Sequence, residues 1–268
     1  MPAPQSITNK GAYWLGRCLK LLGNVLKFCS RLLYFVVPWL RFRLPSEAKP
    51  LSERFDLRKP RITRILWQTN YTNRVSLPVK LNYLCNRLLS ASYRYRFVSD
   101  AEILEFVEAE FPGRISNCYK RLAIGAAKAD LWRLLVLYRY GGVYIDIDGH
   151  LAWPLGWTLR SNPSELFVKS KDSRYTNFFM ASEPGNGLIL QLIEEAIRRI
   201  ESPTTNNVYH LTGPGLMDDL FVEGVCSVAR VEEVCMQGNF TNKFFQYIDK
   251  PGGDWVTAKK TISAVTPL

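Results

Sequence analysis

The sequence predicts an α/β fold, and two observations support this prediction. Strand-like and helix-like segments alternate after Lys59, which is the opening expected of an α/β sheet. Residues 121–140 then form an Ala- and Leu-rich stretch without Pro that ends in Gly141-Gly142 and leads into a β-branched segment. With 268 residues, 47% of them hydrophobic, the chain can bury one substantial core. We therefore expect one folded domain with an N-terminal appendage.

The elements of the folded part follow from hydrophobic spacing and from turn and cap residues. Asp100 is a candidate N-cap, because a side-chain oxygen at that position can accept from the first free N–H groups of a helix. In chain order, we expect a strand over residues 61–69, a helix over 77–92, a strand over 93–98, a helix that starts at Ala101, a helix over 121–140 and a strand over 143–148.

Positive charge is concentrated at the N-terminus. The chain has 35 Lys and Arg against 24 Asp and Glu, a net charge of +11, and such an excess favours an anionic partner. Seven of the basic residues lie in the first 46 positions, where no acid occurs. The rest of the chain is only mildly basic and has no arginine-rich pattern, so we expect no nucleic-acid partner.

The basic leader has a helical pattern. Its polar residues are spaced by three and four, which places them on one stripe of a helix with apolar flanks, and they are Arg17, Lys20, Asn24, Lys27 and Arg31. No uncharged run reaches the about 18–20 residues that a membrane span needs. We therefore predict that residues 1–58 are a membrane-associating leader and linker, with residues 10–45 lying in an anionic membrane surface. A helix docked on its own domain and a tilted or paired span are the alternatives.

Two carboxylates lie at the far end of the strand predicted over residues 143–148. In an extended segment Asp146 and Asp148 share a face, at the strand end where open α/β sheets bind ligands. Adjacent carboxylates repel each other unless a cation neutralises them, and hard oxygen ligands suit Mg²⁺ or Mn²⁺. A divalent metal site is one interpretation of this pair, and a solvated strand end is the other.

The spacing of D-x-x-R at 130–133, G-G-x-Y at 141–144 and D-x-D at 146–148 resembles the sugar-nucleotide signature of glycosyltransferase family 32. The D-x-D sugar-binding region defines that family, and the pattern is also distantly similar to the clostridial glucosylating toxins. The resemblance extends from about Lys59 to Thr257 and is strong over 126–150. It implies a GT-A fold, with a mixed sheet and a Rossmann-like nucleotide half over residues 59–268. It also implies a metal-dependent, retaining transfer of a sugar from a nucleotide-diphosphate donor to a glycan or lipid-linked acceptor.

The resemblance also implies roles for individual residues. Asp146 and Asp148 match the metal and diphosphate motif, and Asp130 and Arg133 match the pair that holds donor hydroxyls and phosphate. Asp130 and Arg133 are one helical turn apart in an apolar segment, so both heads point the same way. The remaining expected positions are Tyr144 beside the donor, Trp67 stacked on the nucleotide base, Asn177 near the donor or acceptor, Trp255 closing over the nucleotide or packing at the C-terminus, and Asp249 or Asp254 completing the metal site.

Two other functions remain open at this stage. The run from Ile145 to Leu151 is similar to the D-x-D-G-T-L motif of haloacid-dehalogenase-like phosphatases, in which Asp146 would be the nucleophile. His150 stands where that motif has Thr, and the D-x-x-R lead-in would have no role. The other alternative is an inactive membrane-bound module that binds sugar nucleotides. For the enzyme we expect the cytoplasmic face of a membrane, with the Golgi lumen as the alternative.

Overall fold

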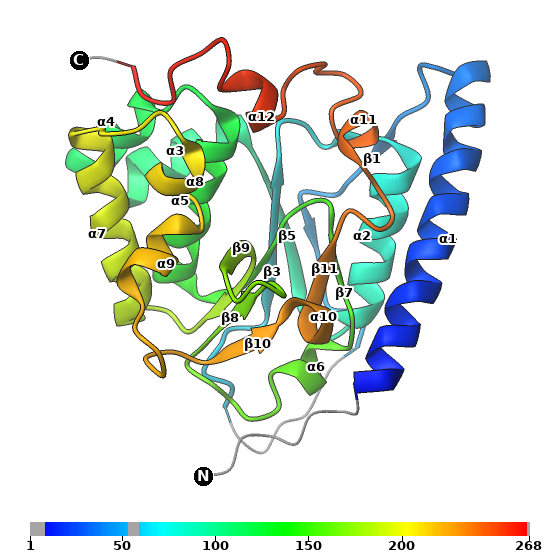
Figure 1. The fold of residues 1–268 in the computed structure, drawn as a ribbon, viewed down its shortest axis with the longest axis horizontal. Helices are drawn as coiled ribbons and strands as arrows, with labels where there is room; N and C mark the ends of the chain where they lie inside the picture. The colour runs from blue at the N-terminus through cyan, green and yellow to red at the C-terminus, as the bar shows by residue number, and fades with distance from the viewer. Residues whose placement is uncertain (1–8, 53–58, 267–268) are drawn as a thin grey trace.

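The fold is built on a seven-stranded mixed sheet with helices on both sides (Figure 1). The computed structural model describes residues 9–52 and 59–266; the side chains of residues 9–19 and the middle of the expected linker, residues 53–58, lie outside this description. In spatial order the strands are β10 (Val228–Arg230), β8 (Glu165–Lys169), β9 (Tyr175–Ser182), β6 (Gly142–Ile145), β3 (Ile65–Asn70), β5 (Arg94–Ser99) and β2 (Glu47–Ala48).

The direction of the strands divides the sheet into two halves. Strands β5, β3 and β6 are parallel, as in a Rossmann-like nucleotide-binding half. Strand β9 runs antiparallel between β6 and β8, and β10 is parallel to β8. The predicted α/β fold with a mixed sheet is therefore confirmed.

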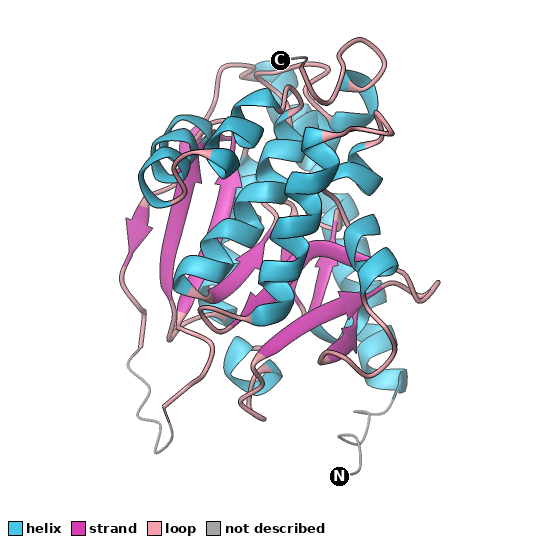
Figure 2. Ribbon diagram, turned by 90° about the vertical axis from the view of Figure 1, so that its left-hand side faces the viewer, coloured by secondary structure: helices cyan, strands magenta, loops and turns pink. Residues whose placement is uncertain are grey.

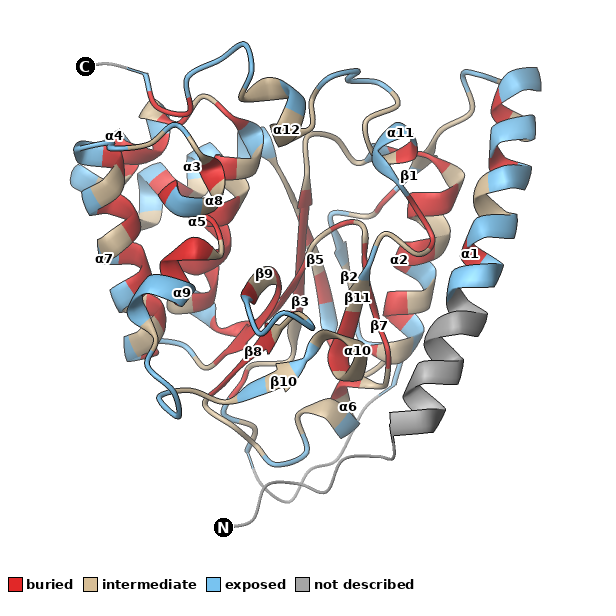
Figure 3. Cartoon of the chain, viewed as in Figure 1, coloured by how far each residue is buried: buried red, intermediate tan, exposed pale blue. Residues whose placement is uncertain are grey.

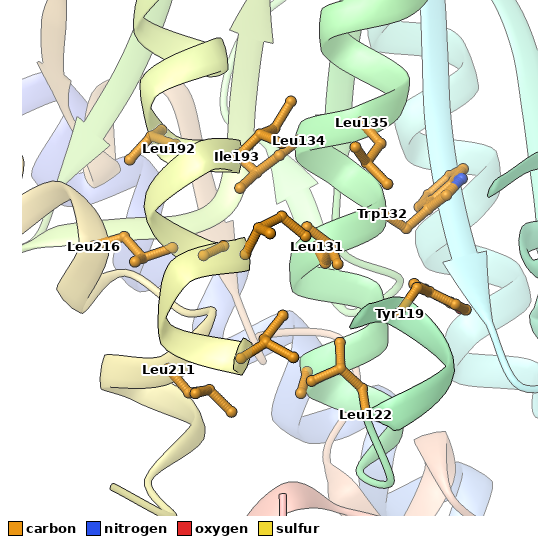
Figure 4. Packing of buried hydrophobic residues seen from close by; sticks show 14 of the residues in the cluster. Tyr119, Leu122, Leu131, Trp132, Leu134, Leu135, Leu192, Ile193, Leu211 and Leu216 are labelled. Carbon is orange, nitrogen blue, oxygen red and sulfur yellow. The ribbon is translucent and has the colours of Figure 1, made fainter. Parts of the chain in front are cut away.

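Two apolar cores cover the two faces of the sheet; helices supply most side chains of the first, and strands and loops supply most of the second. The first core lies under α3 to α5 and α7 to α9, and the second lies under α2. Figure 4 shows Leu131 and Leu134 of α5 packed toward Ile193 of α7, and Figure 2 shows these helices over the sheet. The helices of the two layers are α2 (Leu77–Leu89), α3 (Asp100–Glu110), α4 (Arg114–Arg121), α5 (Gly125–Tyr140), α7 (Gly187–Glu201), α8 (Val208–Leu211) and α9 (Gly215–Leu220).

Short elements complete the fold around this frame. Strand β1 (Phe42–Arg43) pairs with β4 (Arg74–Val75), and β7 (Gly149–Leu151) pairs with β11 (Cys235–Gln237). The pairing of β7 with β11 brings the last third of the chain back beside the D-x-D motif. The remaining short helices are α6 (Leu155–Thr158), α10 (Val231–Val234), α11 (Lys243–Gln246) and α12 (Trp255–Ala258).

Two helix starts differ from the sequence predictions. The helix expected over 121–140 begins only at Gly125, as α5, and Arg121 instead ends the preceding helix α4. The backbone of residues 121–123 between them pairs with the C-terminal segment. The N–H of Ala123 donates to the carbonyl of Ala264 at 3.0 Å, and the N–H of Thr266 donates to Arg121 at 2.8 Å. The predicted cap at Asp100 is also wrong. Ser99 is the N-cap, and the Glu102 carboxylate accepts hydrogen bonds from both its N–H and its hydroxyl.

The N-terminal leader forms one long helix, α1 (Asn9–Val36), that packs against α2 and α10. Figure 1 shows it as an outer layer beside α2. The helix is thus docked on its own domain, which is one of the alternatives that the sequence left open, and membrane binding of its outward face stays a prediction. None of the described helices combines the length and apolar character that crossing a bilayer requires.

Gly142 allows the closest backbone approach near the site. Its φ is +111°, and a Cβ there would lie 2.7 Å from the Ile65 carbonyl oxygen and 2.9 Å from Nε1 of Trp67. Only a glycine can therefore start β6 this close to β3.

We expect Gly142→Ala to lower the free energy of unfolding by at least about 2 kcal/mol, since the backbone conformation and the overlap both disfavour a side chain. Gly187→Ala is the control, because that glycine starts α7 with open space around its Cβ position. Urea denaturation would measure both, and equal midpoints for the two variants would contradict the prediction.

Candidate active site

A cavity of about 660 Å³ opens at the carboxyl ends of the parallel strands. Its lining includes residues from three parts of the chain: Thr69 and Asn70 at the end of β3, Asp130 and Arg133 on α5, and the segment after β11 from Gln237 to Trp255. This is the position where open α/β sheets bind ligands, at the point where strand order reverses. The volume lies within the range of small-molecule and cofactor sites.

The D-x-D carboxylates lie on a turn, not on a strand as the sequence predicted. Strand β6 ends at Ile145, and the N–H of Gly149 donates to the Asp146 carbonyl at 2.9 Å, which folds the chain back into β7. Both carboxylates nevertheless line the cavity and are half-buried. The amide of Gln237 donates to both, at 3.4 Å to Asp146 and 2.9 Å to Asp148, so one donor group reaches the two acids together.

Arg133 links the acid on α5 to the D-x-D turn. It is buried, and its guanidinium lies 2.9 Å from Asp130 Oδ1 and 3.2 Å from Asp146 Oδ1. The same group lies 4.4 Å above the Tyr144 ring, whose hydroxyl donates to Asp146 at 2.7 Å. Asp146 is therefore held from two sides, by a cation from α5 and by a hydroxyl from β6.

Asp130 is the most enclosed acid of the site. Its carboxylate accepts hydrogen bonds from Nδ2 of Asn177 at 2.8 Å and from the Thr212 hydroxyl at 3.3 Å. Asn177 comes from β9, and its carbonyl also accepts a hydrogen bond from Arg133. The predicted group of Asp130, Arg133, Tyr144 and Asn177 thus meets at one wall of the cavity.

Burial sets the protonation behaviour of the acids. It raises the pKa of Asp130 to about 6, against the opposing effect of the Arg133 guanidinium. Burial and then the charge of Asp146 raise the pKa of Asp148 to about 7. A nearby cation stabilises the ionised form of an acid whose pKa is raised. The D-x-D turn is thus an acidic site suited to a positive charge.

Trp67 lies outside the cavity lining, contrary to the sequence prediction. Its ring is buried between Tyr140, stacked at 6.1 Å, and Trp132, edge-on at 6.4 Å, and its Nε1 donates to the Gly141 carbonyl at 2.9 Å. Side chains alternate between the two faces of a strand, so Trp67 in β3 enters the core. It is therefore a core residue without access to a nucleotide base.

The two acids predicted to complete a metal site are engaged elsewhere. Asp249 forms an ion pair with Arg41 at 2.7 Å and does not line the cavity. Asp254 lines it, but its carboxylate pairs with Lys243 at 2.7 Å and caps α12. Among the described residues, no group of three or more His, Cys, Asp or Glu side chains could hold a metal ion. The prediction of a third carboxylate ligand is corrected accordingly.

Trp255 does line the cavity, together with residues that the sequence did not identify. Tyr71 and Tyr247 lie with their rings nearly parallel, 6.1 Å apart at 9°, and Nζ of Lys250 lies 5.6 Å above the Tyr71 ring. Gln237 was missed because only the pairing of β11 with β7 brings it to the D-x-D turn. No sequence pattern near these residues marks them.

The site and the comparisons with known proteins agree on the class of protein. Residues 78–168, which contain D-x-x-R and D-x-D, match a family model described as "Glycosyltransferase sugar-binding region containing DXD motif". The chain is a glycosyltransferase, and the predicted resemblance is confirmed by this match.

Similar curated proteins bear mannosyltransferase names. "Inositol phosphoceramide mannosyltransferase 1" of Schizosaccharomyces pombe is 24% identical, over 89% of this chain and 81% of that protein. "Inositol phosphoceramide mannosyltransferase 3" of the same organism is 25% identical, over 52% of this chain but only 37% of that protein. Among solved structures, "PaToxG Glycosyltransferase" aligns with a TM-score of 0.47 and 15% identity, over 79% of this chain and 81% of that one.

The buried charges predict a specific stability pattern. Arg133→Met should lower the free energy of unfolding by about 3–5 kcal/mol, because it leaves the Asp130 carboxylate buried without its cation. Adding Asp130→Asn should recover part of that loss, since the amide needs no counter-charge. Arg139→Met is the control on the same helix, because its ion pair with Glu110 is exposed and screened by solvent, so its loss should change stability far less. Denaturant titration of all four proteins would reveal the pattern, and equal losses for Arg133→Met and Arg139→Met would refute it.

Proposed function

We propose that this glycosyltransferase is metal-dependent and retaining. It transfers a sugar from a nucleotide-diphosphate sugar to a hydroxyl of a glycan or lipid-linked acceptor at a membrane surface. The observation that supports this most directly is the convergence of Asp130, Arg133, Asp146 and Asp148 on one cavity at the carboxyl ends of the sheet. The mannosyltransferase names of the similar proteins make a hexose donor and a glycolipid acceptor the natural candidates.

The oxygen ligands that the D-x-D turn offers fit a divalent cation. Asp146 and Asp148 offer carboxylate oxygens within reach of a single amide, and burial, followed by the charge of Asp146, raises the pKa of Asp148. Two carboxylates suit Mg²⁺ or Mn²⁺, which typically leaves its other positions to water and phosphate oxygens. When bound, such an ion would neutralise the negative charge that develops on the departing nucleoside diphosphate.

The protein side chains would orient the sugar and fix the turn. Asp130 can accept hydrogen bonds from donor hydroxyls, and its position is set by Asn177 and Thr212. Arg133 supports this role by compensating the charge of Asp130 and by holding Asp146. The ring of Tyr144 lies beneath the guanidinium and its hydroxyl donates to Asp146, which supports the expected position of that tyrosine beside the donor.

We propose that the sugar keeps its anomeric configuration because the acceptor attacks the face of the sugar from which the nucleotide departs. The acceptor hydroxyl oxygen bonds to the anomeric carbon while the bond from that carbon to the diphosphate oxygen breaks, and the proton passes to a donor phosphate oxygen. A double displacement would need a free carboxylate as nucleophile. Asp130 is a poor candidate, because its oxygens are engaged by Arg133, Asn177 and Thr212.

The nucleotide would bind along the wall formed by the segment after β11. Trp255 and the paired rings of Tyr71 and Tyr247 offer flat apolar surfaces, and Lys250 lies next to them. These rings replace Trp67 as candidates for stacking on the base. Aromatic faces with an adjacent cation suit a nucleotide, whose base stacks and whose phosphates are anionic.

The sequence predicts a membrane-associating leader and linker, residues 1–58, and a transferase domain, residues 59–268. Strand β2 (Glu47–Ala48) is an edge strand of the central sheet, so the folded domain includes residues before 59. We place the protein on the cytoplasmic face of a membrane, with the Golgi lumen as the alternative. The haloacid-dehalogenase-like hypothesis is disfavoured, because the family match explains the D-x-x-R segment that a phosphatase would not need. An inactive sugar-nucleotide-binding module would bind the donor without turnover.

We expect Asp146→Asn and Asp148→Asn each to reduce the hydrolysis of a nucleotide sugar by at least about 100-fold while the fold is retained, since each removes a charge from the cation site. The assay would use a panel of UDP- and GDP-sugars with Mn²⁺, scored for release of free sugar. Asp172→Asn, on an exposed turn, should leave the rate unchanged. Full activity in either D-x-D variant would refute the assignment, and phosphate release from phosphomonoesters would favour the phosphatase.

Removal of divalent metal should have the same effect as the D-x-D substitutions. Treatment with EDTA should abolish donor hydrolysis in the wild-type protein, and added Mn²⁺ or Mg²⁺ should restore it. Donor binding with no turnover under any metal condition would instead identify an inactive binding module.

A further inference from the structure

The helix α1 docks on the domain through one narrow side. The docked positions recur at helical spacing and are Gly23, Ser30 and Tyr34, all buried. A Cβ at Gly23 would overlap the backbone carbonyl of Asn239, and the Tyr34 hydroxyl accepts a hydrogen bond from the N–H of Leu77 at 2.8 Å. The helix is therefore fitted to the domain and has a defined rotation about its axis.

The opposite side of α1 is apolar and faces away from the domain. Seven large side chains there are 54–90% exposed, and Trp39, just past the helix, is 73% exposed. Figure 3 shows the exposed stretches of this helix beside its few buried positions. Single exposed apolar residues are ordinary, but a continuous face over several turns marks an interaction surface. We call this surface the outer face, and it consists of Leu21, Leu22, Val25, Phe28, Leu32, Phe35 and Val36.

The charges beside the outer face are all basic. Lys20 and Arg31 are exposed on α1, at its flank, and Arg43 is exposed shortly after the helix. No acid precedes Glu47 in the sequence. Two copies of this chain that met through their outer faces would bring these cations together, which disfavours a dimer. An anionic lipid surface complements both the apolar face and its basic flank.

The same helix supports the wall of the cavity. Nζ of Lys27 donates to the Gly238 carbonyl at 3.3 Å, and the Arg31 guanidinium lies 5.3 Å from the Phe244 ring. The Tyr34 ring lies 6.0 Å from Phe245. These contacts fall in the segment from Gln237 to Tyr247, which lines the cavity at several positions. A partner bound to the outer face would therefore lie at a fixed position relative to the candidate active site.

We propose that the outer face of α1 docks into the plane of an anionic lipid bilayer, and that this docking holds the cavity beside the membrane. The helix lies along the surface, because its inner side is occupied by the domain and its flanks carry Lys20, Lys27 and Arg31. The acceptor hydroxyl then belongs to the headgroup of a membrane lipid. The assignment of a lipid acceptor rests on the proposed function, whereas the docking of α1 does not.

The test measures how the full chain partitions onto vesicles. The wild-type protein should cosediment with phosphatidylcholine vesicles that contain phosphatidylserine, should bind pure phosphatidylcholine at least about tenfold more weakly, and should be released as salt is raised. Phe28→Glu/Phe35→Glu should reduce partitioning onto the anionic vesicles by at least about tenfold. Both side chains point to solvent, at 65% and 90% exposure, so the fold should be retained, as a thermal melt would confirm.

The matched control places two acids on apolar side chains elsewhere on the surface. Val222 and Trp157 are 71% and 61% exposed and lie outside α1, so Val222→Glu/Trp157→Glu should partition as the wild type does. Wild-type binding to neutral vesicles as strong as to anionic ones, or equal partitioning of both double variants, would overturn the proposal. The proposal would also be overturned if sedimentation velocity without lipid showed that Phe28→Glu/Phe35→Glu converts a dimer to a monomer.

Hydrolysis of the donor in lipid-free solution separates this inference from the proposed function. The rate should be the same in the wild type, in Phe28→Glu/Phe35→Glu and in the control, because none of the substituted residues lines the cavity. Vesicle binding without donor hydrolysis would refute the proposed function while the docking surface stood. Donor hydrolysis without vesicle binding would refute the docking surface alone.

Discussion

The buried guanidinium of Arg133 is the interaction on which the site depends. It lies between Asp130 on α5 and Asp146 on the turn after β6, and it is enclosed by the Tyr144 ring and the carbonyl of Asn177. A buried ion pair costs desolvation and adds little net stability, but removal of one partner leaves an uncompensated charge. This constraint ties α5 to the D-x-D turn at the wall of the cavity, which both D-x-D carboxylates line.

The rest of the fold serves to bring these groups together. Gly142 lets β6 start close against β3, the apolar packing of α5 on α7 fixes the helix that carries Asp130 and Arg133, and the pairing of β11 with β7 returns Gln237 to the same turn. The leader is part of this arrangement, because α1 contacts the segment that forms another wall. The candidate membrane surface and the candidate active site are therefore two sides of one structural unit.

The sequence predicted well what depends on local spacing. Asp130 and Arg133 are one turn apart on a helix, and D-x-D adjoins a β-branched strand, so their neighbourhood could be predicted without knowledge of the rest of the fold, although the strand ends at Ile145 and leaves both acids on a turn. The prediction failed where long-range contacts decide: the C-terminal segment pairs with residues 121–123 and delays the start of α5, and Asp249 is paired with Arg41 from the leader. Trp67 was misplaced because its face of β3 could not be known before the strand order.

The proposed reaction depends on Asp146 and Asp148 forming one cation site at the cavity wall. Electron paramagnetic resonance of free Mn²⁺, titrated with protein in the presence of UDP or GDP, measures binding at this site. The wild-type chain should bind one Mn²⁺, and Asp148→Asn should weaken this binding at least about tenfold, since it removes one of two charged ligands. Equal Mn²⁺ binding by Asp148→Asn and the wild type would show that the two acids do not form a cation site.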